Sequence, residues 1–248
     1  MANDPVCGMD ADPKHAAATR GHRGDANGGT PVKRTADGRA TERTRRRYDR
    51  SARYYDALEW LAERRVARWR RSLWAGIQGP LVLELGVGTG KNIPYYPSGA
   101  RLTAIDLAPR MLERARRRAA AQGRHVDLQL GDAQALDFPD HCFDDVVATF
   151  VFCSVPDPVQ GLREARRVLK PGGRLHLIEH VRAPNRAAGW LMDRLNPVAV
   201  RLTGANINRD TVGNVRRAGF SLDEVRSLGI RGLVTRISAS PPAQATPS

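Results

Sequence analysis

Long apolar runs are missing from this sequence. No stretch approaches the ~20 consecutive apolar residues that a membrane-spanning helix requires, and runs such as 146–153 have only the length of a strand. The first residues carry neither a basic start nor an apolar core, which argues against a secretory signal. We therefore expect a cytoplasmic protein.

Cysteine is scarce as well, because the 248 residues contain only Cys7, Cys142 and Cys153. Three widely spaced thiols exclude a disulfide scaffold and a zinc cage of four thiolates. The segment 4–9 around Cys7 resembles the opening of small cysteine-containing, YHS-like modules that associate with metals. Those modules continue with further cysteines that do not follow here, so we expect a truncated remnant and no metal site.

Acidic residues are outnumbered, since 26 Asp and Glu face 40 Lys and Arg and leave a net charge of +14. This balance raises the question of nucleic-acid binding, but the chain has no basic groove interleaved with aromatic residues. A non-enzymatic nucleic-acid binder is therefore the least favoured alternative. The basic helix expected at 57–74 carries Trp60, Trp69 and Trp74, which we expect to pack on a sheet. The alternative is peripheral contact with an anionic membrane surface.

The chain divides into a tail, one domain and a second short tail. Residues 1–40 hold almost no large apolar side chains, so we expect them to be disordered, with the domain at 41–240 and a tail at 241–248. Within the domain, short apolar strands alternate with helical patterns. The expected strands are 81–85, 101–105, 126–130, 145–152, 174–179, 221–228 and 232–238, and the expected helices are 48–75, 109–122, 158–169, 186–203 and 208–218.

This alternation predicts an α/β fold with a doubly wound, mostly parallel seven-stranded sheet, preceded in the chain by N-terminal helices. Such sheets bind ligands at the carboxyl ends of the strands, where the direction of winding reverses. The loop after the first strand reads Glu84-x-Gly86-x-Gly88-x-Gly90. Glycine lets the backbone turn tightly and approach a ligand closely.

Two phosphate-binding interpretations of this loop fail. A P-loop requires Ser or Thr after its Gly-Lys pair, and position 92 holds Asn. A dinucleotide loop requires glycine five residues after the first, and position 91 holds Lys. The acid ahead of the glycines would repel a pyrophosphate, whereas it would attract an ammonium group.

Two further acids follow the next two strands. Asp106 ends the second strand, where a carboxylate accepts from both hydroxyls of a ribose. Asp132 follows the third strand, where it could accept from the amino group of an adenine. S-adenosylmethionine carries an ammonium, a ribose and an adenine but no phosphate, and it therefore fits all three acids.

Four segments in register carry a family resemblance. Residues 84–90, 106–112, 131–139 and 169–175 resemble, in order and spacing, the class I S-adenosylmethionine-dependent methyltransferases. The most similar subgroup contains the ubiquinone/menaquinone-biosynthesis and phosphatidylethanolamine methyltransferases, and the segment 48–56 resembles its leading helix. The resemblance covers about residues 45–238. It implies a Rossmann-like methyltransferase fold, S-adenosyl-L-methionine as cofactor and a small-molecule methyl acceptor.

The resemblance also implies roles along the cofactor. Glu84 and the glycines would hold its methionine end, and Asp106 would bind its ribose. The adenine would lie against Leu107 and Met111, with Asp132 and Ala133 at its edge. Thr149 and Phe150 would lie under the sulfonium, and Tyr55 would close over the cofactor. For three of these residues a structural role is the alternative. Leu107 and Met111 could belong to the core, and Asp132 could be a turn residue. The implied cofactor-binding residues are Tyr55, Glu84, Gly86, Gly88, Gly90, Asp106, Leu107, Met111, Asp132, Ala133, Thr149 and Phe150.

The acceptor side is less defined. In-line methyl transfer depends mainly on positioning, so the absence of an obvious catalytic dyad does not argue against an enzyme. The candidate residues near the acceptor are Cys153, Ser154, Glu179 and His180, with 189–210 as a lid. For the cysteine and the histidine a structural role is the first expectation. A quinone precursor, a lipid head group and a thiol all remain open as acceptors.

Overall fold

The computed structural model describes residues 38–183, 185–229 and 232–242, without the side chains of 55–62 and 202–203. The predicted tail with its Cys7 segment lies outside the described residues, apart from the three residues that begin the first helix. Among the described residues, no helix is both long enough and apolar enough to cross a membrane.

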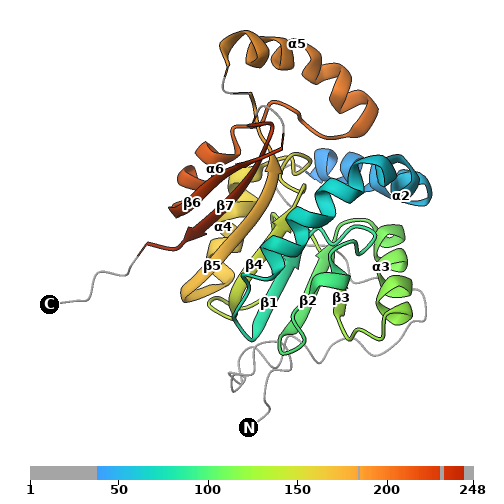
Figure 1. Ribbon diagram of the computed structural model, residues 1–248, viewed down its shortest axis with the longest axis vertical. Coiled ribbons are helices and arrows are strands. Elements are labelled where there is room, and N and C mark those ends of the chain that lie inside the picture. The colour runs from blue at the N-terminus through green and yellow to red at the C-terminus, as the bar shows by residue number, and fades with distance from the viewer. Residues whose placement is uncertain (1–37, 184, 230–231, 243–248) are drawn as a thin grey trace, which may run out of the picture.

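Seven strands form one sheet in the order β3-β2-β1-β4-β5-β7-β6 (Figure 1). Strands β1 to β5 run parallel, and β7 runs antiparallel to both of its neighbours. This arrangement confirms the predicted doubly wound, mostly parallel sheet. The strands are β1 (Leu81–Leu85), β2 (Arg101–Asp106), β3 (Asp127–Leu130), β4 (Phe143–Thr149), β5 (Leu169–His180), β6 (Ser221–Leu228) and β7 (Val234–Ser240).

Helices cover both faces of the sheet (Figure 1). The C-terminal end of α2 and α3 pack on one face, while α4 and α6 pack on the other. A short 3-10 turn, η1, follows the glycine loop. The elements are α2 (Gly38–Trp74), η1 (Ile93–Tyr95), α3 (Pro109–Ala121), α4 (Pro158–Val168), α5 (Arg186–Thr203) and α6 (Thr211–Arg217).

The strands are apolar because both of their faces are buried. On β1, Val82 points into the layer under α2 and α3, and Leu83 points into the layer under α4 and α6. On β4, Val146 and Val147 divide between the two layers in the same way. Side chains alternate along a strand, so each central strand contributes to two separate cores.

The tryptophans of the first helix pack inward. Trp74 is 1% exposed and belongs to the core of its face, and Trp69 packs against that core. The side chain of Trp60 lies outside the described residues. For the two described tryptophans this favours packing on the sheet over the membrane-contact alternative.

Several boundaries differ from the predicted ones, among them those of α2, β4 and β5. α2 begins at Gly38 rather than at residue 48, and Glu42 supports its first turns by pairing with Arg45 and Arg46. β4 ends at Thr149 rather than at residue 152, because Phe150 has a positive φ of 59° that leaves the extended conformation. β5 begins at residue 169 instead of 174, through a segment that sequence alone favours as a turn.

Candidate functional site

A cleft opens at the carboxyl ends of β1 and β4, where the winding of the sheet reverses. It holds about 860 Å³ of space free of protein atoms, including space open to solvent. Strand ends supply its floor, and Thr44 and Tyr48 of α2 lie along its rim. The predicted cofactor residues that line it are Gly86, Gly88, Asp106, Leu107, Met111, Asp132, Ala133, Thr149 and Phe150.

The glycines of the first loop serve different purposes. Gly86 and Gly88 both have positive φ, at 63° and 57°. A Cβ on Gly86 would lie 2.6 Å from the side chain of Val151, whereas a Cβ on Gly88 would meet nothing within 4 Å. Gly88 therefore borders open cleft. Gly90 does not line the cleft, because its Cβ position faces α3 at Ala115 and it is needed for packing.

Asp106 is anchored at the end of β2 by two backbone donors. The N–H of Gly88 donates to Oδ2 and the N–H of Ala108 donates to Oδ1, both at 2.8 Å. Burial raises the pKa of the Asp106 carboxyl to about 6, although these two hydrogen bonds act in the opposite direction. The carboxylate is thus rigidly held at the cleft and is ionised at neutral pH.

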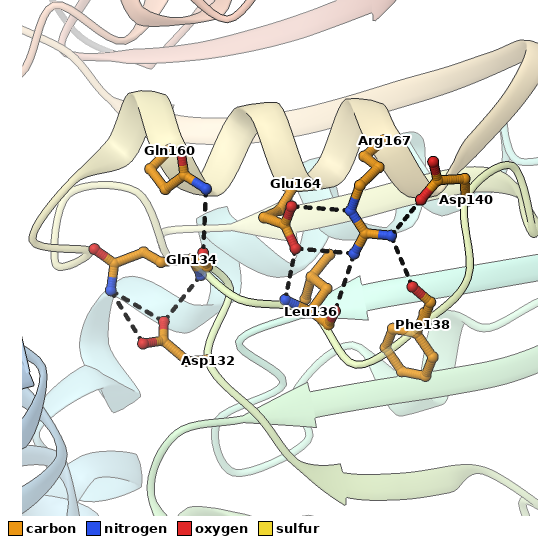
Figure 2. Close-up of polar contacts among 8 residues, drawn as sticks. All are labelled: Asp132, Gln134, Leu136, Phe138, Asp140, Gln160, Glu164 and Arg167. Carbon is orange, nitrogen blue, oxygen red and sulfur yellow. Dashed lines mark hydrogen bonds and ion pairs between the residues drawn. The ribbon is translucent and has the colours of Figure 1, made fainter. Parts of the chain in front are cut away.

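The loop after β3 forms the opposite end of the cleft. Asp132 accepts from the backbone N–H of Gln134 at 2.9 Å and from its side-chain amide at 3.1 Å. The side-chain oxygen of Gln134 accepts from the N–H of Asp157 at 2.9 Å, which ties this loop to the start of α4. Gln160 reaches the same loop from α4 (Figure 2).

Arg167 of α4 binds the following part of that loop, residues 136–140 (Figure 2). Its guanidinium donates to the carbonyl oxygens of Leu136 at 2.9 Å and Phe138 at 2.8 Å. It also pairs with Glu164 at 2.9 Å and with Asp140 at 2.7 Å. Hydrogen bonding with Glu164 raises the pKa of Arg167 above its ordinary value, so the clamp remains charged.

We expect Arg167→Gln to lower the free energy of unfolding by about 2 kcal/mol, since several charge-assisted hydrogen bonds are lost at a partly exposed site. Thermal or urea unfolding measures this change. Arg163→Gln alters an exposed arginine on the same helix and serves as the matched control. Equal stability of the two variants would contradict the stabilising role of Arg167.

Arg70 is a site residue that sequence reasoning missed. It lies on α2, is 6% exposed, and donates from Nη1 to Asn92 Oδ1 and Thr149 Oγ1, each at 2.8 Å. Its guanidinium lies 5.8 Å from the ring centre of Phe150 and borders the cleft. Its Nε has no hydrogen-bond partner among the described residues, although Glu63 lies 3.6 Å away. No local signal distinguishes this arginine from its neighbours in an Arg-rich helix.

Glu84 lies behind the cleft and does not line it. It is fully buried, and its two oxygens accept from the Asn92 amide and the Tyr96 hydroxyl. Burial raises the pKa of the Glu84 carboxyl to about 7. Because Asn92 also accepts from Arg70, Glu84 is linked to the cleft through one intermediate side chain.

On the acceptor side, only one of the four predicted residues lines the cleft. Ser154 does so, and its hydroxyl is hydrogen-bonded to the Tyr48 hydroxyl of α2. Burial raises the pKa of the Cys153 thiol to about 12, so this thiol is neutral at physiological pH. The exposed His180 ring lies against Phe150, with ring centres 4.8 Å apart.

Glu179, the remaining acceptor-side candidate, holds the loop after β4. Its Oε1 accepts from the N–H of Val151 at 2.7 Å and of Phe152 at 3.0 Å. Its Oε2 is buried and has no hydrogen-bond partner among the described residues. Burial raises the pKa of the Glu179 carboxyl to about 7. The acid therefore positions the loop that ends the cleft.

The raised pKa values of Glu84 and Glu179 predict how stability depends on pH. An acid whose pKa is raised on folding stabilises the fold below its unfolded pKa of 4.5, and this stabilisation is lost as the pH rises through about 7. We therefore expect the free energy of unfolding to fall over this window. For Glu179 alone, the change is about 3 kcal/mol, at about 1.4 kcal/mol per pKa unit.

Urea unfolding between pH 4.5 and 8 tests this dependence. Glu179→Gln keeps an oxygen that can accept from the two backbone donors and should show a flatter profile than the unaltered chain. Glu224→Gln, on the exposed side of β6, is the matched control and should keep the full slope. If the free energy of unfolding of Glu179→Gln fell with pH as steeply as that of the unaltered chain, the prediction would be wrong.

Two further predicted features are the closing tyrosine, Tyr55, and the lid, 189–210. The side chain of Tyr55 lies outside the described residues, so its closure over a cofactor stays a prediction. The predicted lid, 189–210, is anchored at Asn206, which donates twice to the Cys153 carbonyl oxygen, at 2.9 and 3.0 Å. Within the described ranges, no cluster of three or more His, Cys, Asp or Glu side chains is placed to hold a metal ion.

Comparison with known proteins relates the chain to methyltransferases. Residues 83–177 match the family model described as a methyltransferase domain. Demethylmenaquinone methyltransferase of Clavibacter sepedonicus is 34% identical over 174 residues, which cover 62% of this chain and 71% of that protein. Thiol S-methyltransferase TMT1B of Rattus norvegicus is 36% identical over 147 residues, covering 56% of this chain and 59% of that protein. The chain thus spans less than two thirds of the rat protein.

A solved structure has the same fold at low sequence identity. The crystal structure of a SAM-dependent methyltransferase from Thermotoga maritima superposes with a TM-score of 0.62 and 22% identity. The match covers 79% of this chain and 99% of the other. At this identity the likeness establishes the fold alone, and it agrees with the strand order described above.

Proposed function

This chain belongs to the S-adenosylmethionine-dependent methyltransferases, and we propose that it transfers the methyl group of S-adenosyl-L-methionine to a small-molecule acceptor in the cleft between β1 and β4. One observation carries the proposal. The cleft has a fixed carboxylate, Asp106, beside an open glycine turn, and a buried guanidinium, Arg70, also borders it. A ligand with a diol and a carboxylate satisfies both.

The residues present fit this cofactor. Gly88 leaves room for a ligand where a Cβ would project into the cleft, and Asp106 supplies an acceptor for two ribose hydroxyls. Asp132 would accept from the adenine amino group, with Leu107 and Met111 against the ring. These side chains would fix the nucleoside before the methyl group is in place to react.

Arg70 would hold the carboxylate at the methionine end. Arg70 pairs with Glu63 at 3.6 Å, and Thr149 and Asn92 keep its guanidinium beside the cleft, where it can form a further charge-assisted hydrogen bond with a ligand carboxylate. Glu84, which the sequence places at the same end, would then act as a positioning residue through Asn92.

When bound, S-adenosyl-L-methionine supplies a methyl group already activated by its sulfonium. What this chain contributes is geometry: the acceptor atom must be close and collinear, and water must be excluded. Phe150, Val155 and Pro156 form an apolar wall of the cleft, and this wall would keep water away from the reacting atoms. Tyr48 and Ser154 supply paired hydroxyls that can orient a polar acceptor atom.

The acceptor class follows from the bases that the described cleft lacks. No histidine or glutamate is among the described lining residues, and Asp106 and Asp132 are assigned to the nucleoside. The lining lysine, Lys91, is paired with Glu63 at 3.1 Å, and the Tyr48 hydroxyl is bonded to Ser154. An acceptor that ionises without strong assistance is therefore favoured, and a thiol meets this condition because its ordinary pKa is ~8.5. A quinone precursor with a phenolic hydroxyl is the second candidate. The names of the rat and Clavibacter relatives agree with these two classes.

Two measurements test the proposal. Isothermal titration calorimetry should detect saturable binding of S-adenosyl-L-methionine. Transfer of labelled methyl should then be screened across small thiols, phenols, amines and lipid head groups, with thiols expected to accept first. If the cofactor binds but only amines accept, the acceptor class is wrong, and if no cofactor binds, the function itself is wrong.

A further inference from the structure

Helix α5 carries an apolar face that none of the described residues covers. The exposed side chains are Trp190 at 59%, Leu191 at 51%, Leu195 at 49% and Val198 at 55%. At about 100° per residue, these four positions fall within one side of the helix. Figure 1 shows α5 standing at one end of the molecule, apart from the sheet. Scattered exposed apolar residues are ordinary, but a contiguous group marks an interaction surface.

Basic residues accompany this face. Arg186, Arg194 and Arg201 are exposed on the same helix, and the Arg194 guanidinium lies 5.3 Å from the ring centre of Trp190. The one acid of the helix, Asp193, is paired with Arg182 at 2.8 Å. The helix therefore offers apolar side chains together with unbalanced positive charge.

This combination selects a lipid surface over a second copy of the chain. In a two-fold symmetric contact between α5 helices, arginines 194 and 201 of the two copies would approach each other and repel. Anionic lipid head groups would instead neutralise the arginines while the apolar side chains enter the acyl boundary. Tryptophan is suited to that boundary because it combines an apolar body with a polar N–H.

We propose that the exposed face of α5, formed by Trp190, Leu191, Leu195 and Val198 with the flanking Arg194 and Arg201, seats this protein on anionic phospholipid bilayers. The interaction is peripheral. It assigns membrane contact to α5, whereas the sequence offered helix 57–74 for such contact only as the alternative to packing on the sheet.

The same helix is attached to the acceptor side of the cleft. Asn196 of α5 accepts from the N–H of Ile207 at 2.9 Å and donates to Asn206 at 3.1 Å. Asn206 in turn donates to the carbonyl oxygen of Cys153, next to Ser154 in the cleft wall. Just beyond α5, Gly204 packs against the side chain of Arg47 on α2. At the same 100° per residue, Asn196 lies on the opposite side of α5 from the exposed face, so the helix would separate a bilayer from the acceptor wall. Delivery of an amphiphilic acceptor past this helix rests on the function proposed above.

Vesicle sedimentation with the full chain tests the proposal. The vesicles contain phosphatidylcholine alone or phosphatidylcholine mixed with phosphatidylglycerol, at low and high salt. The unaltered chain should bind the anionic vesicles, and the double variant W190S/L195S should bind at least about ten-fold more weakly. The variant R194Q/R201Q should lose the preference for anionic vesicles.

Val225→Ser is the matched control, because Val225 is 48% exposed but lies on β6. It should bind vesicles like the unaltered chain. Equal vesicle binding by W190S/L195S and the unaltered chain overturns the proposal. So does a dimer in light scattering that W190S/L195S abolishes, because the face would then belong to a second copy.

Calorimetry separates this proposal from the proposed function. W190S/L195S should bind S-adenosyl-L-methionine with unchanged affinity, since neither residue lines the cleft. A chain that binds vesicles through α5 but transfers no methyl group would refute the function alone. A chain that transfers methyl groups but ignores vesicles would refute the lipid surface alone.

Discussion

Asp106→Ala should weaken binding of S-adenosyl-L-methionine by about 100-fold or more, because two hydrogen bonds to a charged acceptor are lost at ~1.5–3 kcal/mol each. Asp106 lies at the cleft with its carboxylate already fixed by Gly88 and Ala108. Little reorganisation is needed when a ribose arrives, so most of the interaction energy appears as affinity. Isothermal titration calorimetry measures the loss directly.

The same carboxylate makes binding depend on pH. The pKa of Asp106 is raised to about 6, and only the ionised form accepts from both hydroxyls. Affinity should therefore be full above pH 7 and fall as the pH drops through 6. In Asp106→Asn the part of this pH dependence that is centred near pH 6 should vanish.

Asp127→Asn is the matched control, since Asp127 is an exposed acid at the start of β3 that does not line the cleft. It should bind S-adenosyl-L-methionine like the unaltered chain. Because alanine at position 106 also leaves two backbone donors unpaired, a thermal melt must show that the variant is folded. A folded Asp106→Ala chain with unaltered affinity would refute the assigned role.

Arg70→Met should weaken S-adenosyl-L-methionine binding by about 10- to 100-fold, the range expected when a charge-assisted pair is lost from a site where the guanidinium is 6% exposed. The expected effect depends on which part of the ligand is present. 5′-Methylthioadenosine lacks the amino-acid end, so its affinity should hardly change. The ratio of the two affinities measured by calorimetry thus isolates the contact with the carboxylate.

Arg71→Met provides the control on the adjacent position. Arg71 is exposed, lies over the ring of Tyr95 and does not line the cleft. Arg70→Lys should retain part of the affinity, because lysine keeps the charge but loses the two-pronged geometry. If methylthioadenosine binding fell as far as S-adenosyl-L-methionine binding, Arg70 would be supporting the cleft as a whole.

Local spacing predicted the part of the site that lies on strand ends. Asp106 directly ends an apolar strand, and Gly88 lies in the loop after its neighbour, so topology alone brings them together. Glu84 illustrates where the interpretation had to be refined. Side chains alternate along β1, and Glu84 shares the α2-facing side of Val82, which directs its carboxylate toward the buried Asn92.

The contribution of Arg70 could not be predicted from local pattern. It depends on where α2 crosses the sheet, and helix crossings are set by packing among distant segments. The early end of β4 was equally hidden, because the positive φ of Phe150 has no sequence signal in a non-glycine residue. The first turns of α2 are held by polar pairs and have no apolar periodicity, so the sequence pattern did not predict them as helix.

Two separate parts of helix α2 border the cleft. α2 supplies Thr44 and Tyr48 at the rim and Arg70 beside Thr149, within a single continuous element. We therefore expect a ligand in the cleft to slow the local unfolding of α2. Amide hydrogen exchange across 41–74 would then serve as a gauge of how fully the protein is loaded.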